Sequence, residues 1–175
     1  MQIKVLQLGY LQTNCYLLIS NKKVLLIDPA DEFDVIKSNL NNLNLVGVIV
    51  THHHPDHVGA LEKVIKEYNV KLYDFYSLSE GKNIIDNFQF EVIHTPGHTS
   101  DSITIYFEKE EIMFVGDFIF RNSIGRTDLP TGDYNVMKQS IKKIKCYSDV
   151  IIYPGHGDST TLDYEKKSNQ FFFEL

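Results

Sequence analysis

The sequence is poor in the residues that mark several common classes of protein. It contains two cysteines, Cys15 and Cys146, whose wide separation argues against a disulfide framework and against a cysteine-based zinc finger. It has 17 Lys and Arg against 23 Asp and Glu, and no basic block. Proteins that bind nucleic acid use such a block to neutralise phosphates, so we expect no nucleic acid partner.

Long apolar runs are missing as well. No segment approaches the ~20 apolar residues of a membrane-spanning helix. Gln2, Gln7 and Asn14 interrupt the N-terminal segment, which therefore lacks the apolar stretch of a signal peptide. The 175 residues, 43% of them hydrophobic, suffice for one domain with its own core. We expect a single domain over residues 1–175, in the cytoplasm and without a membrane partner.

The hydrophobic pattern predicts two similar halves, each with strands and helices. The expected strands lie around Ile3 and Val5 and over residues 15–20, 23–27, 45–50, 71–73, 90–93, 102–107, 111–115 and 150–153. One helix is expected after Asp31, whose carboxylate would accept the first-turn amides, with apolar positions from Phe33 to Leu43; others run from Val58 to Tyr68, from Asp133 to Lys145 and from near Thr160. This order favours two packed sheets with helices outside.

The strongest chemical signal is the segment THHHPDH at residues 51–57, directly after a predicted strand. Side chains alternate in direction along an extended segment, so His52 and His54 point to one side and His53 to the other. The first pair is predicted to converge on a metal ion. We interpret His53 as an outward or supporting imidazole.

The end of the same segment offers a second pair of ligands. Asp56 and His57 follow a proline bend, so they approach from a different direction. Neutral imidazole and carboxylate are ligands that Zn²⁺, Fe²⁺ and Mn²⁺ accept. The segment is therefore typical of a site for two ions.

Three further apolar strands end at a residue of ligand type. The motif TPGHT places His98 after a turn, FVGD places Asp117 at a strand end, and IIYPGHG places His156 after Pro-Gly. A buried carboxylate is costly unless it is paired or bound to metal, and the two oxygens of Asp117 suit a bridge between two ions. His94 precedes the TPGHT turn, where a hydrogen-bonded core or supporting histidine is expected.

The motifs THxHxDH, TPGHT, GD and PGHG, in this order, resemble those of the metallo-β-lactamase superfamily. The segment SIGRTDLP at residues 123–130 is similar to that of the glyoxalase II-like hydroxyacylglutathione hydrolases, particularly their short bacterial relatives. The resemblance extends from Thr51 to His156. It implies an α+β fold, a four-layer αββα sandwich with metals at the sheet edge.

The same resemblance implies a role for each motif residue. One metal would be held by His52, His54 and His98 and the other by Asp56, His57 and His156, with Asp117 and a water or hydroxide between them. Asp56 and Asp117 would be the catalytic residues. Arg126 would contact a substrate carboxylate, and the alternative is an Arg126–Asp128 pair that only braces the loop.

The expected reaction is hydrolysis of a hydroxyacyl thioester such as S-lactoylglutathione, in which a metal-bridging hydroxide attacks the thioester carbonyl. A thiolate leaves without a strong general acid, because the pKa of its thiol is near 8.5. The expected cofactors are two divalent ions, zinc first and iron or manganese otherwise. Full-length glyoxalase II enzymes carry a C-terminal helical domain that supplies much of the glutathione site, and we expect no such domain here. The small-molecule partner would then be a thioester, with a glutathione conjugate as the leading candidate.

Two other functions stay open from the sequence. Persulfide dioxygenases of the same superfamily use one iron at positions matching His52, His98 and Asp117, which resemble a two-His, one-carboxylate set. A non-catalytic metal-binding protein on the same fold would also keep the motifs. Other branches fit less well: flavodiiron enzymes have Glu where His54 stands, the nucleases usually need a basic surface, and β-lactamases are usually exported.

Overall fold

The first half of the chain forms a five-stranded sheet, called sheet A here. The computed structural model describes residues 1–173. Sheet A has the order β1-β2-β3-β4-β5, in which β1 to β3 are an antiparallel meander and β4 and β5 join in parallel. The strands are β1 (Gln2–Leu8), β2 (Thr13–Ser20), β3 (Lys23–Ile27), β4 (Asn44–Ile49) and β5 (Leu72–Tyr73).

The second half forms a six-stranded sheet, sheet B, with the order β13-β12-β9-β8-β7-β6. Strands β9 and β12 are parallel, and the other neighbours are antiparallel. The strands are β6 (Gly81–Ile85), β7 (Phe88–His94), β8 (Ile103–Phe107), β9 (Ile112–Gly116), β12 (Ile151–Pro154) and β13 (Thr160–Thr161). A separate hairpin of β10 (Ile119–Phe120) and β11 (Ser123–Ile124) follows β9.

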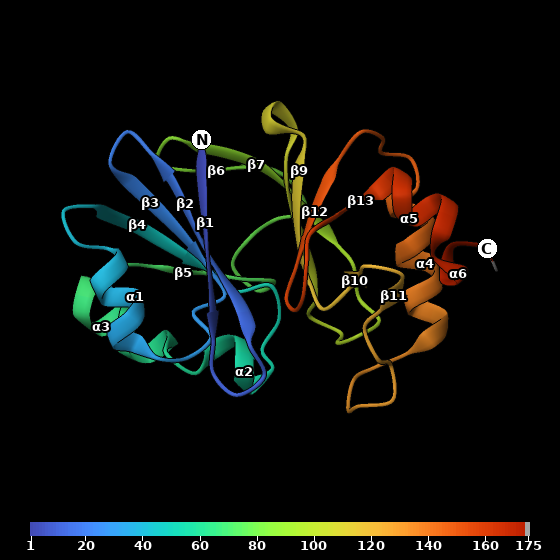
Figure 1. Cartoon of the computed structure of the whole chain (residues 1–175), viewed down its shortest axis with the longest axis horizontal. Coiled ribbons are helices and arrows are strands. Elements are labelled where there is room, and N and C mark those ends of the chain that lie inside the picture. The colour runs from blue at the N-terminus through green and yellow to red at the C-terminus, as the bar shows by residue number, and fades with distance from the viewer. Residues whose placement is uncertain (174–175) are drawn as a thin grey trace.

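Helices cover the outer faces of both sheets and complete four layers (Figure 1). The outer face of sheet A carries α1 (Phe33–Asn39) and α3 (Leu61–Tyr68), and that of sheet B carries α4 (Tyr134–Ile144), α5 (Leu162–Ser168) and α6 (Gln170–Phe173). The single turn α2 (Pro55–Val58) follows β4, and a 3-10 turn, η1 (Glu108–Glu110), joins β8 to β9. The predicted α+β fold, an αββα sandwich, is confirmed.

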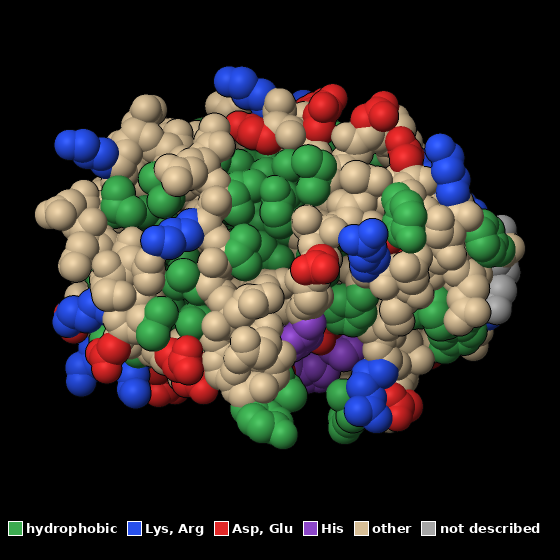
Figure 2. Space-filling view, in the orientation of Figure 1, with side chains coloured by type: hydrophobic (Ala, Val, Ile, Leu, Met, Phe, Trp, Pro, Cys, Tyr) green, Lys and Arg blue, Asp and Glu red, His purple; other side chains and the backbone are tan. Residues whose placement is uncertain are grey.

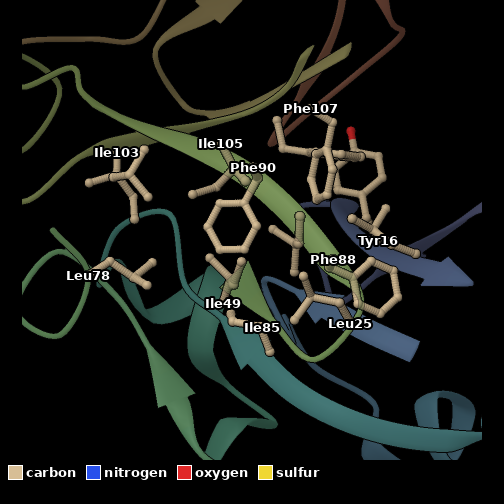
Figure 3. Packing of buried hydrophobic residues seen from close by; sticks show 14 of the residues in the cluster. Tyr16, Leu25, Ile49, Leu78, Ile85, Phe88, Phe90, Ile103, Ile105 and Phe107 are labelled. Carbon is tan, nitrogen blue, oxygen red and sulfur yellow. The ribbon is translucent and has the colours of Figure 1, made fainter. Parts of the chain in front are cut away.

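Apolar side chains fill the space between the two sheets (Figure 3). Tyr16 and Leu25 of sheet A face Phe90, Ile105 and Phe107 of sheet B, and all of them are buried. Close packing of this kind fixes the distance between the sheets. The loops at the sheet edges are therefore held in a defined position relative to one another.

The first predicted helix is present with different ends. α1 ends at Asn39, so Leu43 lies outside it. Glu32, in the left-handed region at φ 49°, precedes the helix, and Asp31 accepts a hydrogen bond from the N–H of Glu32. The prediction that Asp31 caps the helix is wrong, because the left-handed residue separates its carboxylate from the first turn.

The predicted helix over residues 58–68 is two helices, α2 and α3. They are separated at Gly59 and Ala60. The N–H of Ala60 donates to the carbonyl of Pro29 at 3.0 Å, and a Cβ at Gly59 would lie 2.4 Å from the carbonyl oxygen of Ala30. This close contact with the loop after β3 interrupts the helix.

Hydrophobic patterning missed the shortest elements and one longer strand. β10, β11 and β13 are two residues long and have no detectable periodicity, and the sequence GKNII of β6 does not alternate between apolar and polar residues, although its burial does. In the tail, Phe172 is buried and Phe173 is exposed, while Glu174 and Leu175 lie outside the described residues. Within residues 1–173, no helix is long and apolar enough to cross a membrane.

Candidate metal centre

Three histidines from two loops form the first candidate ligand group. His52 and His54 follow β4, and His98 follows β7. The ring centroids lie 4.8 Å apart for His52 and His54, 5.0 Å for His52 and His98, and 4.6 Å for His54 and His98. His54 Nδ1 lies 2.9 Å from His98 Nε2. Figure 2 shows histidine side chains in a hollow between the two halves of the molecule, at its lower edge.

A second candidate group lies beside the first. Asp56 and His57 are on α2, and His156 follows β12. Asp56 Oδ2 is 3.1 Å from His156 Nε2 and 3.6 Å from His57 Nε2. The ligand atoms of this group all lie within 4.8 Å of one another.

Asp117 lies between the two groups. It follows Gly116, which ends β9 in the left-handed region at φ 53°. Its Oδ1 is 3.2 Å from His57 Nε2, and its Oδ2 is 3.5 Å from the Nε2 atoms of both His98 and His156. The structure therefore brings all seven predicted ligands together at one sheet edge, with Asp117 in contact with both groups.

The chemistry of the cluster fits a divalent cation. Apart from the 3.2 Å contact between His57 Nε2 and Asp117 Oδ1, three of its buried atoms, His52 Nε2 and these two, have no hydrogen-bond partner among the described residues. Each unsatisfied buried polar atom costs about 1–3 kcal/mol. Imidazole nitrogens and carboxylate oxygens without a thiolate suit Zn²⁺, Fe²⁺ or Mn²⁺. A cation bound among these atoms would satisfy all three.

Asp28 orients one of these histidines. It is fully buried, and its Oδ2 accepts hydrogen bonds from His57 Nδ1 at 2.9 Å and from Thr51 Oγ1 at 2.7 Å. Its Oδ1 accepts the N–H of Thr51 at 2.7 Å. Because Nδ1 is the donor to Asp28, His57 offers Nε2 to the cluster. Asp28 was not predicted from the sequence, although it directly follows the apolar strand β3 in the same way as Asp117 follows β9.

Backbone carbonyls orient two other histidines. His98 Nδ1 donates to the carbonyl of Arg126 at 2.7 Å, and His156 Nδ1 donates to the carbonyl of Leu11 at 3.1 Å. In both rings the Nε2 atom is then directed into the cluster. The two contacts tie the site to the loop after β11 and to the β1–β2 turn.

The first histidine group disfavours protonation. Burial, followed by the nearby His57, holds the pKa of His52 well below its usual value. Burial and the neighbouring His98 lower the pKa of His54 in the same way. Both rings are therefore neutral near pH 7, as metal ligands must be.

The second group favours positive charge when no cation is bound. Hydrogen bonds to Asp117 and Asp56 raise the pKa of His156 to about 9. Burial lowers the pKa of His57, but the charge of Asp28 and the contact with Asp117 outweigh it and raise the pKa to about 10. Burial alone would raise the pKa of Asp117, and His156 and His57 instead hold it well below its usual range. Without a cation, the protons on His57 and His156 thus supply the positive charge that balances the nearby carboxylates.

A glycine makes room for the cluster. A Cβ at Gly155 would lie 2.2 Å from Asp117 Oδ1 and 2.6 Å from His57 Cε1. No side chain fits at this distance from the two candidate ligands. The Gly preceding His156 is therefore required by the geometry of the site.

The two remaining histidines lie outside the cluster. His53 points away from it, with Nδ1 2.6 Å from Asp101 Oδ2 and Nε2 3.4 Å from Asp74 Oδ2. His94 packs on Phe75, with ring centroids 4.6 Å apart. His94 lies outside the candidate ligand groups, as expected, although its Nε2 is buried without a hydrogen-bond partner among the described residues.

The side chain of Arg126 is paired with Asp128. Its Nε donates to Asp128 Oδ1 and its NH2 group to Asp128 Oδ2, each at 2.7 Å, and both side chains are exposed. This is the bracing arrangement that the sequence analysis gave as the alternative. A contact between Arg126 and a substrate stays a prediction.

Comparisons with known proteins agree with the site. Residues 8–77 and 77–156 match the family described as the metallo-beta-lactamase superfamily. The chain is 32% identical to the hydroxyacylglutathione hydrolase GloC of Haemophilus influenzae, with 98% of each chain covered. Among solved structures, it is similar to the BLEG-1 B3 metallo-beta-lactamase, with a TM-score of 0.93, 30% identity and coverage of 98% and 99%. It is also similar to TTHA1623 in a di-iron-bound form, with a TM-score of 0.88, 29% identity and coverage of 96% and 99%.

Proposed function

Because the chain belongs to the metallo-beta-lactamase superfamily, we propose that it is a metal-dependent hydrolase that cleaves a hydroxyacyl thioester. S-lactoylglutathione is the leading candidate substrate, since a relative with 32% identity over nearly its whole length is named a hydroxyacylglutathione hydrolase. Two divalent ions are the proposed cofactors. Zinc is the first choice, and the di-iron form of a similar structure makes iron an explicit alternative.

One observation carries the proposal. The buried atoms His52 Nε2, His57 Nε2 and Asp117 Oδ1 converge, and apart from the 3.2 Å contact between the last two, none has a partner among the described residues. A scaffold that binds no cation gains nothing from gathering such atoms, because each buried polar atom left unsatisfied reduces stability. The arrangement is explained by an ion that pairs with them.

The protein's residues would have different roles around the two metal ions. Two divalent cations would supply an activated water at neutral pH and polarise a carbonyl oxygen. Asp117, which contacts both ligand groups, would keep them at a fixed separation. Asp56 is held by the Thr13 hydroxyl at 2.9 Å and by His156, so its carboxylate is in place to orient a water. Asp56 and His156 are also more exposed than His57 and His98, so a substrate would approach from their side.

The leaving group explains why a thioester fits a site of this composition. The cluster holds no evident proton donor for a strongly basic leaving group once its histidines bind cations. A thiolate needs none, because its conjugate thiol has a pKa near 8.5. An amide nitrogen would need such a donor.

Arg126 is the proposed contact for a substrate carboxylate. It would have to leave Asp128, and the cost is small because an exposed ion pair contributes about 0–1 kcal/mol. An Arg fork matches a carboxylate with two parallel hydrogen bonds. The same segment already contacts the metal cluster through the carbonyl of Arg126.

Thiol release from S-lactoylglutathione tests the proposal. The assay compares the chain stripped of metal with the chain loaded with zinc, iron or manganese. Metal-dependent thiol release is expected, and Asp117→Asn is expected to abolish it while the fold, followed by circular dichroism, is retained. The matched control is Asp101→Asn, which changes a carboxylate that contacts His53 outside the cluster.

Two parallel assays cover the other branches of the superfamily. Oxygen consumption on glutathione persulfide with one iron per chain, and no thiol release, would replace the hydrolase proposal with a dioxygenase. Hydrolysis of a chromogenic β-lactam without thiol release would favour the activity named for one similar structure. A fully metal-loaded chain that is inactive in all three assays would point to a non-catalytic metal-binding protein.

A further inference from the structure

The β10–β11 hairpin borders the candidate metal centre. The Phe120 ring lies 6.2 Å from the ring of His156. Arg126 follows the hairpin, and its carbonyl accepts the Nδ1–H of His98 at 2.7 Å. The position of the hairpin therefore affects the orientation of a proposed ligand.

The hairpin cannot hold this position by itself. Its strands are two residues long and pair only with each other, and isolated hairpins of any length are marginal in water. At its turn, Asn122 adopts the left-handed region at φ 61°. Ile119 and Ile124 pack into the core cluster on the outer face of sheet B, but the turn at residues 121–122 is exposed, so contacts from outside the hairpin must fix it.

Two buried side chains of the C-terminal helix region bind that turn. Glu165 Oε2 accepts the N–H of Asn122 at 2.9 Å, and Asn169 Nδ2 donates to the carbonyl of Ser123 at 2.9 Å. Asn169 Nδ2 also donates to Glu165 Oε2 at 2.8 Å. The two residues thus form one hydrogen-bonded unit, which we call the hairpin clamp.

The burial of Glu165 needs an explanation. Its exposed fraction is 0%, and within residues 1–173 no Lys, Arg or His forms an ion pair with it. Its Oε1 accepts the Thr160 hydroxyl at 2.6 Å. A carboxylate buried without a cation is expensive and is found where all its hydrogen bonds are made and are needed. Here they join α5 to a hairpin on the rim of the metal centre.

Movement of the hairpin would be transmitted to the ligands. Gly125, between the hairpin and Arg126, packs so closely that a Cβ there would lie 1.8 Å from the carbonyl oxygen of Asp117. The N–H of Gly125 also donates to the carbonyl of Phe118 at 3.2 Å. Because Gly125 is in such close contact with the backbone at Asp117, a displaced hairpin would also displace that backbone and the Arg126 carbonyl that accepts the His98 N–H.

We propose that Glu165 and Asn169 are positioning residues of the metal centre. The hairpin clamp holds the carbonyl of Arg126 against His98 Nδ1, which keeps the proton on that atom and leaves Nε2 as the atom offered to a metal. The proposal rests on the ligand role assigned to His98 under the proposed function. It also gives the segment at residues 123–130 a role through its backbone, separate from any substrate contact by the Arg126 side chain.

The direct test is the tautomer of His98 in the metal-free protein, read from its ring ¹⁵N chemical shifts. In the unsubstituted chain, His98 is expected to carry its proton on Nδ1. Glu165→Met keeps the length of the side chain and removes both oxygens, so the N–H groups of Asn122 and Asn169 lose their shared acceptor and the clamp opens. A mixture of the two His98 tautomers is expected in this variant.

Metal binding supplies the second readout. Stepwise titration with zinc against a chelator is expected to show that Glu165→Met weakens the site of His52, His54 and His98 by about 10–100-fold, the usual cost of losing a group that orients a ligand. The site of Asp56, His57 and His156 is expected to lose less affinity, because the Asp28 carboxylate and the Leu11 carbonyl that orient its histidines do not touch the clamp.

The matched control is Thr161→Ala. Thr161 caps α5 by accepting the N–H of Tyr164 at 3.2 Å, so its loss destabilises the same helix without touching the hairpin. It is expected to leave the His98 tautomer and both metal affinities unchanged. An equal effect of Thr161→Ala and Glu165→Met would show that helix stability alone is responsible, and would overturn the proposal.

Two further outcomes separate the possible failures. If Glu165→Met does not fold, Asn169→Ala removes the donor to Ser123 and to Glu165 but leaves the Glu165 contact with Asn122, and its expected effects are the same in direction. An unchanged His98 tautomer and unchanged affinities in the folded variant refute the clamp. If the chain binds zinc without hydrolysing a thioester, the proposed function fails while the clamp is still decided by the tautomer.

Discussion

The contact between Asp28 and His57 yields the most specific prediction. Asp28 Oδ2 lies 2.9 Å from His57 Nδ1, and both residues are fully buried. Asp28→Asn keeps the size of the side chain. It also keeps one oxygen for the N–H of Thr51, which lies 2.7 Å from Oδ1 in the unsubstituted chain. It replaces the second oxygen by an N–H group that faces the Nδ1–H of His57.

Because the N–H group of the substituted side chain and the Nδ1–H of His57 would then face each other, the His57 ring must move its proton to the other nitrogen. The ring can keep a hydrogen bond to the amide only by accepting at Nδ1, which moves its proton to Nε2. Nε2 is the atom directed at Asp56 and Asp117, so the proton would block a bound cation. Loss of a group that orients a ligand typically costs 10–100-fold in metal affinity, or about 1.4–2.7 kcal/mol.

The assay is a chelator competition that resolves both metal-binding steps, with circular dichroism as a check on the fold. Asp28→Asn is expected to weaken the step that involves His57 by 10–100-fold and to lower thiol release in parallel. Asp74→Asn is the control, since Asp74 is a buried carboxylate that contacts His53 rather than a proposed ligand. Unchanged affinity and activity in Asp28→Asn would refute the role given to this hydrogen bond.

Three other predictions follow from the site. The pKa values of His57 and His156 are raised to about 10 and about 9, so the stability that their positive charge adds to the folded protein is fully present below pH 6.5 and is lost as pH rises from there through these values. The melting temperature of the metal-free protein should therefore fall as pH rises over that range, and a flat profile would contradict the assignment. Gly155→Ala places a Cβ 2.2 Å from Asp117 Oδ1 and should remove at least one metal equivalent, measured by elemental analysis. Arg126→Ala should raise KM for S-lactoylglutathione several-fold with little change in kcat, and an unchanged KM would leave Arg126 a structural brace.

The gathering of the proposed ligands at one place was predictable because four of them follow an apolar strand. His52, His98, Asp117 and His156 all stand at strand ends, and such ends meet at one edge when two sheets pack together. The outward direction of His53 also followed from strand alternation. Hydrophobic periodicity predicted the two halves and most of the long elements, because burial of one face of a helix or strand repeats along the chain.

The supporting contacts were not predictable from local patterns. Asp28 and Glu165 are separated from their partners by 29 and 43 residues, so only the folded chain reveals the hydrogen bonds that they make. The cap expected at Asp31 failed because Glu32 takes a left-handed conformation. The split of the helix after Pro55 depends on a contact with the loop after β3, which no local periodicity encodes.

The number of metal ions needed for thioester hydrolysis tests the central claim most directly. Metal-free protein is titrated with zinc or iron while thiol release from S-lactoylglutathione and bound metal are measured in the same samples. Activity that rises until two equivalents are bound, and that is lost together with the second equivalent, is the expected result. Full activity at one equivalent, or two bound equivalents without any thiol release, would contradict the account.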